Sequence, residues 1–258
     1  MNIMPIPAKS SADENAVKSA NKKLYDGIAG DYERIDGRRT PALSAWLADN
    51  LRSVRNAAPG GKLLDIGAGA GFVSRCAKGI FDERVGLDLS RKILAANADA
   101  FEMGVCGDVD DMPFADGSFD AAVCFAVLHH MYDFAALVSE VARVLKPGGI
   151  FYSDHDLDAA FRRNFALPVY IYRMFKNSGT KKKLAEINVS YDDYDLSEFR
   201  SQGVPSRRLA GLLSAAGFDV KMKFHWYGSL PPLDSALGNL RLPRGLAPLL
   251  SIRAVKKG

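Results

Sequence analysis

The residues best suited to chemistry in this sequence are three glycines behind a short apolar run. Lys62 to Ile66 lead into Gly67, Gly69 and Gly71, and Phe72 to Lys78 can continue as a helix. Glycine has no Cβ atom, so a turn built from it can adopt positive φ and admit a bulky ligand close to the backbone. Free N–H groups at the start of the helix favour polar or anionic groups there. The pattern predicts a binding turn for a nucleotide-like cofactor, and a glycine-rich turn without a ligand is the alternative.

The spacing of these glycines differs from the dinucleotide-binding fingerprint Gly-x-Gly-x-x-Gly. The third glycine comes one residue early, and Phe72 stands where the fingerprint has Gly or Ala. An acid, Asp65, lies inside the motif, and a long segment with helical patterns precedes the first predicted strand. These departures disfavour a nicotinamide-dependent dehydrogenase.

Two further acids follow apolar runs at similar intervals. Arg84 to Leu89 is a second predicted strand with Asp88 near its end, and Phe101 to Cys106 is a third with Asp108 just beyond it. The carboxyl ends of strands in an open α/β sheet face the crevice where ligands bind. We therefore expect Asp65, Asp88 and Asp108 to line one crevice, although each acid alone is also an ordinary solvated loop residue.

The same positions resemble a known family. Leu63 to Gly71 resembles motif I of the class I S-adenosylmethionine-dependent methyltransferases, and the resemblance continues through Gly107 to Phe114, Leu128 to Met131 and Leu145 to Gly149. Tyr25 to Tyr32 is similar to a segment that closes over the cofactor in the ubiquinone and menaquinone biosynthesis type, whose acceptors are small molecules. Anchoring of an N-terminal helix is the alternative role for the two tyrosines.

This resemblance implies S-adenosylmethionine as the cofactor and S-adenosylhomocysteine as the product. Asp88 then corresponds to the family's ribose acid, and Asp108 to the acid that accepts from the adenine amino group, beside the Val109 N–H. Leu89 and Met112 would sandwich the adenine ring. The other residues expected at the cofactor are Tyr25, Tyr32, Asp65, Gly67, Ala68, Gly69, Gly71 and Phe125.

The resemblance and the alternation of strands with helices predict an α/β fold. We expect a Rossmann-like, seven-stranded, mostly parallel sheet of order 3-2-1-4-5-7-6, with the last strand antiparallel, helices on both faces and an inserted cap. N-terminal helices or a lid should occupy residues 1–60, and the cofactor-binding core 61–155. The cap should occupy 156–205, and the C-terminal part of the sheet 206–258.

Local signals set the expected limits of several elements. Ser11 to Glu14 has the form of a capping box that begins a helix running towards Leu24. Asp133 is suited to cap a helix that ends at Lys146 to Gly149, and Ile150 to Ser153 then forms the fifth strand.

Methyl transfer needs a base only when the acceptor is a hydroxyl, a protonated amine or an acidic carbon, and histidine suits that task near neutral pH. In some small-molecule members of the family, a histidine of the Leu-His-His segment acts with an acid after strand five. The resemblance therefore makes His130 and Asp154 the catalytic candidates. The alternative is that His129 or His130 packs on the cofactor or hydrogen-bonds the backbone.

The predicted cap should select the acceptor. Phe161, Phe165, Val169 and Tyr172 recur at helical spacing, and the stripe either lines a pocket for a hydrophobic or aromatic acceptor or belongs to the core. The neighbouring basic residues either meet an anionic headgroup or form a solvated face, and they are Arg162, Arg163, Arg173 and Lys176.

Composition and charge limit the partners and the kinds of site that we expect for this sequence. A net charge of +4 is too small to predict a nucleic-acid partner, and Phe125 to Leu128 stands where a base-recognition motif would follow strand four. Three separated cysteines predict neither a disulfide framework nor a thiolate metal site, and the four histidines form no metal-ligand motif. We expect a cytoplasmic protein without a metal or a transmembrane segment, able to form a homodimer.

The sequence thus predicts an S-adenosylmethionine-dependent methyltransferase acting on a small, hydrophobic or aromatic molecule, with O-, N- and C-methylation all open. A non-catalytic S-adenosylmethionine-binding regulatory module is the alternative, because it would keep the same acids.

Overall fold

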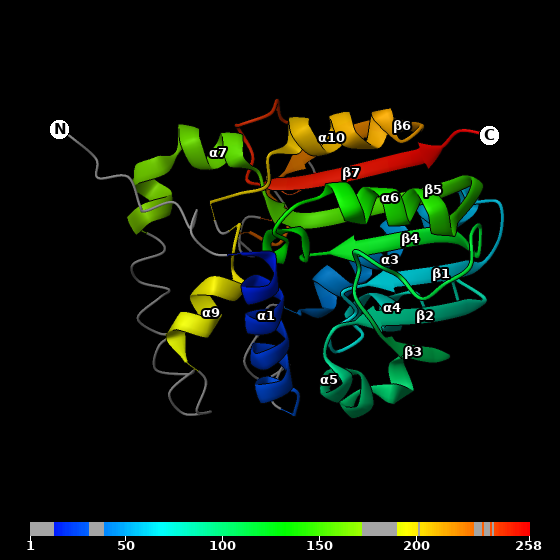
Figure 1. The fold of residues 1–258 in the computed structure, drawn as a ribbon. Helices are drawn as coiled ribbons and strands as arrows, with labels where there is room; N and C mark the ends of the chain where they lie inside the picture. The colour runs from blue at the N-terminus through cyan, green and yellow to red at the C-terminus, as the bar shows by residue number, and fades with distance from the viewer. Residues whose placement is uncertain are drawn as a thin grey trace.

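Seven strands form one sheet in the computed structural model, which describes residues 13–30, 39–171, 190–200, 202–229, 234, 238 and 240–258 (Figure 1). The strands are β1 (Lys62–Ile66), β2 (Glu83–Asp88), β3 (Met103–Cys106), β4 (Phe119–Phe125), β5 (Leu145–Leu157), β6 (Phe218–His225) and β7 (Leu249–Lys256). Their order is β3-β2-β1-β4-β5-β7-β6. β7 runs antiparallel to β5 and β6, and the other neighbours are parallel. The predicted strand order and antiparallel last strand are confirmed.

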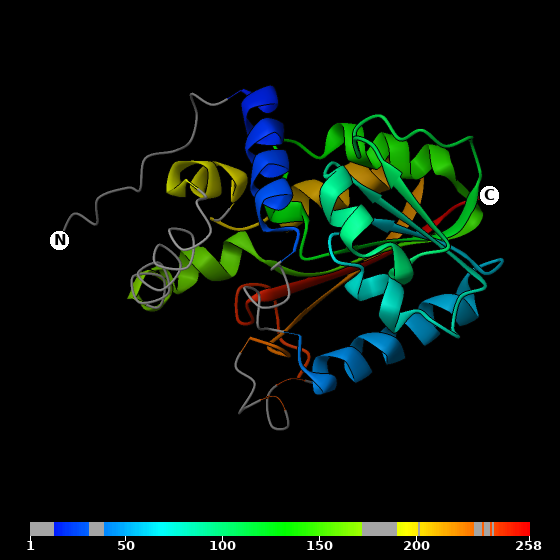
Figure 2. The same ribbon diagram turned by 90° about the horizontal axis from the view of Figure 1, so that it is seen from below.

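Helices cover both faces of the sheet (Figures 1 and 2). α6 (Ala135–Val144) and α10 (Ser206–Ala215) contribute to the apolar core on one face, and α3 (Pro41–Ala57) and α4 (Phe72–Cys76) to the core on the other. α5 (Arg91–Ala96) follows β2 and packs near β3. β4 lies at the centre and is buried along almost its whole length, as its apolar sequence requires.

The first helix begins later and ends later than the sequence signals indicated. α1 (Glu14–Ile28) has Asp13 as its N-cap, whose carboxylate accepts a hydrogen bond from the backbone N–H of Ala16 at 2.7 Å. Ser11, the predicted cap, lies outside the described residues. The helix continues past Leu24 because its last turn is buried against a neighbouring helix.

That neighbour is α9 (Tyr191–Ser197), which lies beside α1 (Figures 1 and 2). Leu24 and Ile28 form a small apolar cluster with two tyrosines of α9. The ammonium of Lys23 lies 2.5 Å from the carboxylate of Asp193. A helix of the predicted N-terminal region therefore pairs with a helix of the predicted cap, and the division into those domains stays a prediction.

Asp133 does not cap α6, so that prediction is wrong. The N-cap of α6 is Phe134, and no side chain caps the helix. The Asp133 carboxylate lies instead 2.8 Å from the guanidinium of Arg208 in α10. An ion pair between two helices of the same layer thus replaces the local cap.

The fifth strand is longer than predicted. It begins at Leu145, which pairs with Phe119 of β4, and regular pairing resumes at Ile150 after an irregularity. Lys146 to Gly149 therefore lies inside β5 and does not separate it from the helix. β5 also continues past Ser153, because its second half pairs with β7 on the other side.

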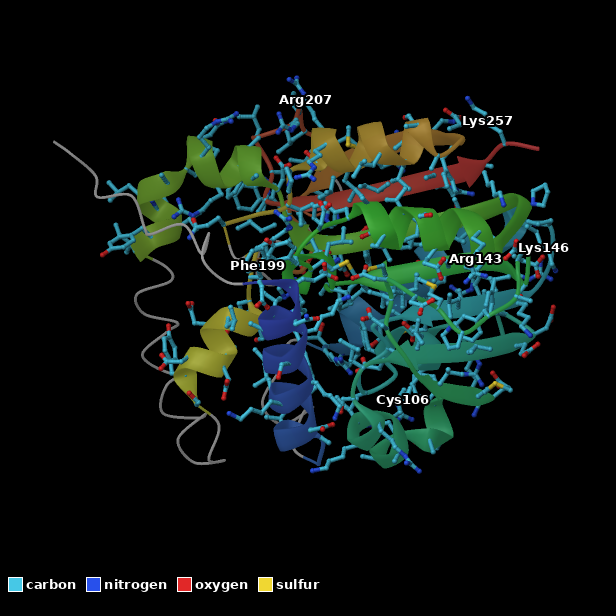
Figure 3. The ribbon with its side chains drawn as sticks, in the orientation of Figure 1. Cys106, Arg143, Lys146, Phe199, Arg207 and Lys257 are labelled. Atoms are coloured by element: carbon cyan, nitrogen blue, oxygen red, sulfur yellow. The ribbon has the colours of Figure 1, made fainter. Side chains whose placement is uncertain are left out.

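The three cysteines are free, and Cys106 is exposed at the end of β3 (Figure 3). Cys76 is half-buried and Cys124 is buried. Among the described helices, none is both long enough and apolar enough to cross a membrane.

Candidate functional site

A cavity of about 640 Å³ lies where the parallel strands end. It is lined by the glycine turn, the ends of β2 and β4, parts of α1 and the chain that follows β5. Three acids that the sequence predicted at strand ends share this one cavity. The predicted site residues that line it are Tyr25, Asp65, Gly67, Ala68, Gly69, Asp88, Leu89, Asp108, Val109, Phe125 and His130.

Other predicted site residues do not line the cavity. Gly71 is the N-cap of α4, where an added Cβ atom would lie 2.3 Å from the Ala100 side chain. Met112 is 2% exposed and packs in the core on the α6 face, so the prediction that it contacts the adenine ring is wrong. Asp154 is buried behind the cavity wall. Tyr32 lies outside the described residues.

The glycine turn has the backbone that its sequence predicted. Gly67, Gly69 and Gly71 have φ of 65°, 50° and 75°, which side chains disfavour. A Cβ atom on Gly67 would lie 2.7 Å from the Val127 side chain, whereas one on Gly69 would meet nothing closer than 3.9 Å. The turn is thus packed at Gly67 and open at Gly69, where a ligand can approach the main chain.

Asp65 and Asp88 are both buried beside this turn. The Asp65 carboxylate accepts from the backbone N–H and the hydroxyl of Ser74 at 3.1 and 2.7 Å. Asp88 accepts from the backbone N–H groups of Gly69 and Ser90 at 2.9 and 2.8 Å. Burial raises the pKa of Asp65 to about 7 and also raises the pKa of Asp88. Each oxygen of Asp88 has one backbone donor and keeps a further lone pair for a ligand.

A lysine of α1 enters the cavity beside Asp108, which sequence reasoning did not predict. The Lys18 ammonium lies 2.8 Å from Asp108, 2.6 Å from Asp110 and 2.6 Å from Glu14. Burial lowers the pKa of Lys18, but the three carboxylates outweigh it and raise that pKa overall. Asp110 Oδ1 is buried without a hydrogen-bond partner in the described part of the chain. This end of the cavity can therefore accept further hydrogen bonds.

The two histidines after β4 have opposite electrostatic environments. Nδ1 of His129 lies 2.7 Å from Asp156, and its Nε2 faces Glu198 at 3.7 Å. Burial lowers the pKa of His129, but Glu198 and Asp156 raise it to about 10. Burial and the neighbouring His129 instead lower the pKa of His130 to about 4. At neutral pH His129 is charged and His130 is neutral.

Asp154 orients other side chains and does not face the cavity. Its Oδ1 lies 2.8 Å from Nδ1 of His155 and 2.9 Å from Nε2 of His225, and its Oδ2 accepts from the Tyr152 hydroxyl at 2.6 Å. Burial raises the pKa of Asp154, but His225 and His155 outweigh it and hold that pKa well below the usual range. His155, which lines the cavity, is thus fixed through Nδ1.

The remaining ring nitrogens argue against reading this cluster as a metal centre. The ligand atoms of Asp154, His155 and His225 lie within 4.8 Å of one another. A metal-bound histidine normally donates its other N–H to an outer partner. Nε2 of His155 and Nδ1 of His225 have no such partner among the described residues. The hydrogen bonds of His155 and His225 to Oδ1 of Asp154 account for the close approach of these three side chains.

The backbone is strained at two strand ends that face the cavity. Ala126, directly after β4, has a φ of 55°, and His155 has a φ of 68°. They are the non-glycine residues of the described chain with positive φ, and both line the cavity. Such conformations cost about 1–3 kcal/mol and gather at functional sites. His155 also stacks on Phe125, with ring centroids 4.4 Å apart.

The far end of the cavity is apolar and aromatic. Phe161 stacks on Phe165 at 4.6 Å between centroids and meets Trp226 edge to face at 5.2 Å. All three residues line the cavity, as does Val169. The helical stripe from the predicted cap therefore faces the cavity, and its last member, Tyr172, lies outside the described residues.

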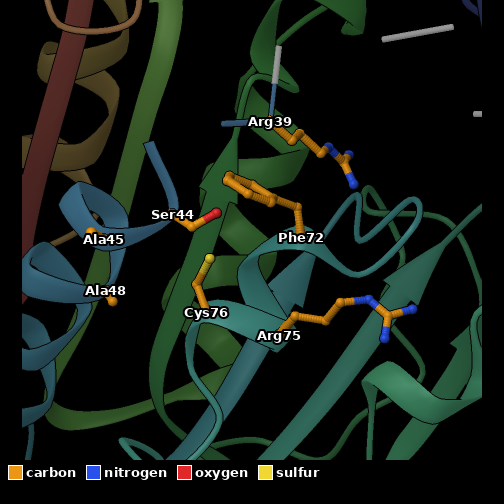
Figure 4. A pocket seen from close by; sticks show the side chains of 7 residues that line it. All are labelled: Arg39, Ser44, Ala45, Ala48, Phe72, Arg75 and Cys76. Carbon is orange, nitrogen blue, oxygen red and sulfur yellow. The ribbon is translucent and has the colours of Figure 1, made fainter. Parts of the chain in front are cut away.

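A second cavity of about 620 Å³ lies between α3 and α4 (Figure 4). Arg39 and Phe72 line both cavities, and the Arg39 guanidinium lies 5.0 Å from the centre of the Phe72 ring. The other arginine of this cavity, Arg75, pairs with Asp99 at 2.6 Å. Phe72 thus forms a wall between the cavities.

Comparison with known proteins agrees with this geometry. Residues 64–153 match a family model described as a methyltransferase domain, and this range begins in β1 and ends in β5. The sheet that surrounds them has the strand order predicted for class I methyltransferases. Residues 64–153 thus resemble a methyltransferase domain, and the match covers 90 of the 258 residues of the chain.

Curated relatives that match about half of this chain are methyltransferases whose names give different acceptors. Demethylmenaquinone methyltransferase of Corynebacterium glutamicum is 33% identical over 144 residues, which are 55% of this chain and 61% of the relative. Malonyl-[acyl-carrier protein] O-methyltransferase of Serratia marcescens is 28% identical over 143 residues, 55% of this chain and 54% of the relative. The chain thus spans less than two thirds of the length of these relatives.

Solved structures share the fold of this chain at low sequence identity. A possible histamine N-methyltransferase from Thermotoga maritima has a TM-score of 0.59 at 18% identity, covering 92% of this chain and 99% of that one. The [4+2]-cyclase SpnF has a TM-score of 0.57 at 17% identity, covering 92% and 94%. The titles of these two structures give different reactions, so the shared fold does not identify the acceptor of this chain.

Several cavity residues carried no signal in the sequence. Lys18 and Glu198 lie far from the motifs along the chain and reach the site only through tertiary packing. His155 lines the cavity at a position in β5 where its φ is positive, which residue type does not predict.

Proposed function

We propose that this chain transfers a methyl group from S-adenosylmethionine to a small, apolar acceptor. The observation that carries the proposal is that one cavity joins the glycine turn and Asp88 to the aromatic wall of Phe161, Phe165 and Trp226. The bound cofactor would supply a sulfonium-activated methyl group for in-line displacement. Alignment of the two reactants in a dry cavity can then supply much of the acceleration.

The ribose is assigned to Asp88. Its carboxylate is 9% exposed, lines the cavity and retains acceptor capacity on both oxygens beyond the backbone bonds from Gly69 and Ser90. A vicinal diol supplies two O–H donors, and bonds to a carboxylate are charge-assisted. The open face of Gly69 leaves room for the cofactor against the main chain.

The adenine is assigned to the end of the cavity beside Asp108. Asp108 is partly exposed and accepts from the backbone N–H of Asp110 at 3.0 Å while pairing with Lys18. Leu89 and Val109 also line this cavity. We infer that Leu89 contributes one apolar face for the ring and that Asp108 or Asp110 accepts from its amino group.

The acceptor is assigned to the aromatic end, and we propose a hydroxylated aromatic ring. Stacked Phe161 and Phe165 suit a flat, apolar molecule. The name of one relative, a demethylmenaquinone methyltransferase, supports an apolar ring as the acceptor, and neither that name nor the name of the malonyl-[acyl-carrier protein] O-methyltransferase mentions nucleic acid. O- and C-methylation of such a ring both begin with loss of the hydroxyl proton.

We propose that His130 receives this proton through Tyr25. The Nε2 atom of His130 lies 2.9 Å from the hydroxyl of Tyr25, and both residues line the cavity. The tyrosine hydroxyl can accept a proton from the ring hydroxyl while donating its own to Nε2. Asp154 has a different role in this proposal, that of a positioning residue. Its carboxylate lies 2.8 Å from Nδ1 of His155, and the His155 ring stacks on Phe125.

Two measurements test the proposed function. Isothermal titration calorimetry should detect binding of S-adenosylhomocysteine to the whole chain. Transfer of radioactive methyl from S-adenosylmethionine should be detected with a monoprenylated 1,4-naphthoquinol among a panel of phenols. Binding without methyl release to any phenol or quinol would overturn the proposed activity and favour a binding module.

A further inference from the structure

The chain that follows β5 forms a helical segment with apolar residues on two opposite sides. α7 (Ala159–Asn164) is followed by helical residues 166–171, and the backbone N–H of Val169 donates to the Phe165 carbonyl at 3.1 Å. One side of the segment lines the cavity. The residues on this side recur at helical spacing, and they are Phe161, Phe165, Pro168 and Val169. This side is accounted for by the site already described.

The other side faces solvent. Leu167, Tyr170 and Ile171 are 62%, 48% and 46% exposed, and they follow the lining residues by about half a helical turn. Large exposed apolar side chains gathered on one helix mark an interaction surface more often than chance.

The charge of this segment indicates the partner. Arg162 and Arg163 form no ion pair with any carboxylate of the described residues, whereas other surface arginines such as Arg52, Arg75 and Arg208 do. In the sequence, residues 159–184 contain seven Lys or Arg and no Asp or Glu. Basic and apolar side chains on one helix are the combination that binds the interface of anionic lipids.

We propose that the outer face of this segment, defined by Arg163, Leu167, Tyr170 and Ile171 with the half-buried Arg162 beside it, docks on an anionic lipid surface. A second copy of the chain is a poorer occupant, because a twofold contact would bring uncompensated arginines together. Pro168 lines the cavity and is itself exposed, so the aromatic end of the cavity adjoins the face that would meet lipid, and an apolar acceptor would enter there. This last step rests on the proposed function.

Vesicle binding of the full-length protein tests the docking face. Phosphatidylcholine vesicles with phosphatidylglycerol should co-sediment the protein at least tenfold better than phosphatidylcholine alone. Binding to the mixed vesicles should fall steeply as sodium chloride is raised, because salt screens the arginines. Equal binding to both kinds of vesicle, or binding to neither, would overturn the proposal.

Variants separate the two kinds of contact. Arg162→Gln with Arg163→Gln should weaken binding to the mixed vesicles about 25-fold, at roughly fivefold per residue. Leu167→Ser with Ile171→Ser should weaken it roughly tenfold or more at high and low salt alike. The matched control is Lys78→Gln with Lys257→Gln, which removes the same charge elsewhere (Lys257 in Figure 3) and should bind as wild type.

Two further readouts keep the outcomes distinct. Sedimentation equilibrium that shows a dimer lost in Leu167→Ser with Ile171→Ser would identify a second copy as the occupant and overturn lipid docking. Calorimetry with S-adenosylhomocysteine reports the proposed function separately. Binding of that ligand without vesicle binding removes only the docking face, and vesicle binding without that ligand removes only the proposed activity.

Discussion

The hydroxyl of Tyr25 in α1 lies 2.9 Å from Nε2 of His130, directly after β4. Nδ1 of the same ring lies 2.9 Å from the carbonyl oxygen of Ser197 in α9, which can only accept a hydrogen bond. The His130 proton therefore sits on Nδ1, and Nε2 accepts from Tyr25. One neutral imidazole joins both outer helices to the strand end where the acceptor is expected.

Tyr25→Phe should destabilise the protein, because it removes the hydrogen-bond donor to Nε2 of the half-buried His130. The expected loss is about 1–3 kcal/mol of unfolding free energy at pH 7, measured by urea denaturation. Tyr132→Phe is the matched control, since Tyr132 is 37% exposed and its hydroxyl bonds no described residue. Equal losses in the two variants would show that the Tyr25 hydroxyl bond contributes nothing.

Asp88→Asn should weaken S-adenosylhomocysteine binding about 100-fold, because it replaces two charge-assisted bonds to the ribose by weaker ones. The 2′-deoxy analogue should bind the wild-type protein weakly. Asp88→Asn should lower the affinity for this analogue by a smaller factor than it lowers the affinity for S-adenosylhomocysteine. Calorimetry with both ligands measures the four affinities. Asp99→Asn, an exposed acid paired with Arg75, is the control and should leave them unchanged. A normal affinity in Asp88→Asn would remove the ribose assignment.

The glycine turn could be predicted from the sequence because its causes are local, whereas the strand order was implied by the family resemblance. Three glycines at positive φ need no distant partner, and β1, β2 and β3 are short strands with an acid at or near their ends. Lys18 could not be predicted, because a lysine on an amphipathic helix reads as solvated until the helix is placed against Asp108 and Asp110.

Side-chain direction limited the prediction elsewhere. Met112 follows the predicted adenine acid in sequence, yet its side chain points into the core while its backbone N–H donates to Glu140 at 2.7 Å. Asp154 was predicted at the site but does not line the cavity, whereas the next residue, His155, has positive φ and does line it. Neither direction is encoded in residue type or spacing.

The amino group of the adenine distinguishes Asp108 from Asp110. Replacing that amino group by oxygen, as in S-inosylhomocysteine, should weaken binding to wild type at least tenfold, because a carboxylate then faces an acceptor. Whichever of Asp108→Asn and Asp110→Asn abolishes this preference identifies the partner, and the unpartnered Oδ1 of Asp110 favours the second. If wild type binds the two ligands equally, neither acid contacts the amino group.

His129 should make stability fall at alkaline pH. Its pKa is raised from about 6.5 in the unfolded chain to about 10 by Glu198 and Asp156, so its contribution is complete below pH 6.5 and is lost as pH rises through 10. Urea denaturation of wild type and His129→Gln from pH 6 to 10 measures the difference. The two curves should converge as pH rises, and Asp156→Asn should behave like His129→Gln. A constant gap across this range would contradict a charged His129.

Asp65 should make the preference for the sulfonium over the thioether depend on pH. Burial raises its pKa from 3.8 to about 7, so the carboxyl is neutral below that pH and ionised above it. S-adenosylmethionine carries one more positive charge than S-adenosylhomocysteine, and Asp65 lines the cavity. The ratio of their affinities should therefore rise in favour of the sulfonium by roughly threefold to tenfold between pH 6 and 8. Groups that the two ligands share cancel in this ratio, which calorimetry measures directly. Asp65→Asn, which has a similar shape and no charge, should flatten the dependence, and a rise that survives this substitution would assign the effect to another group.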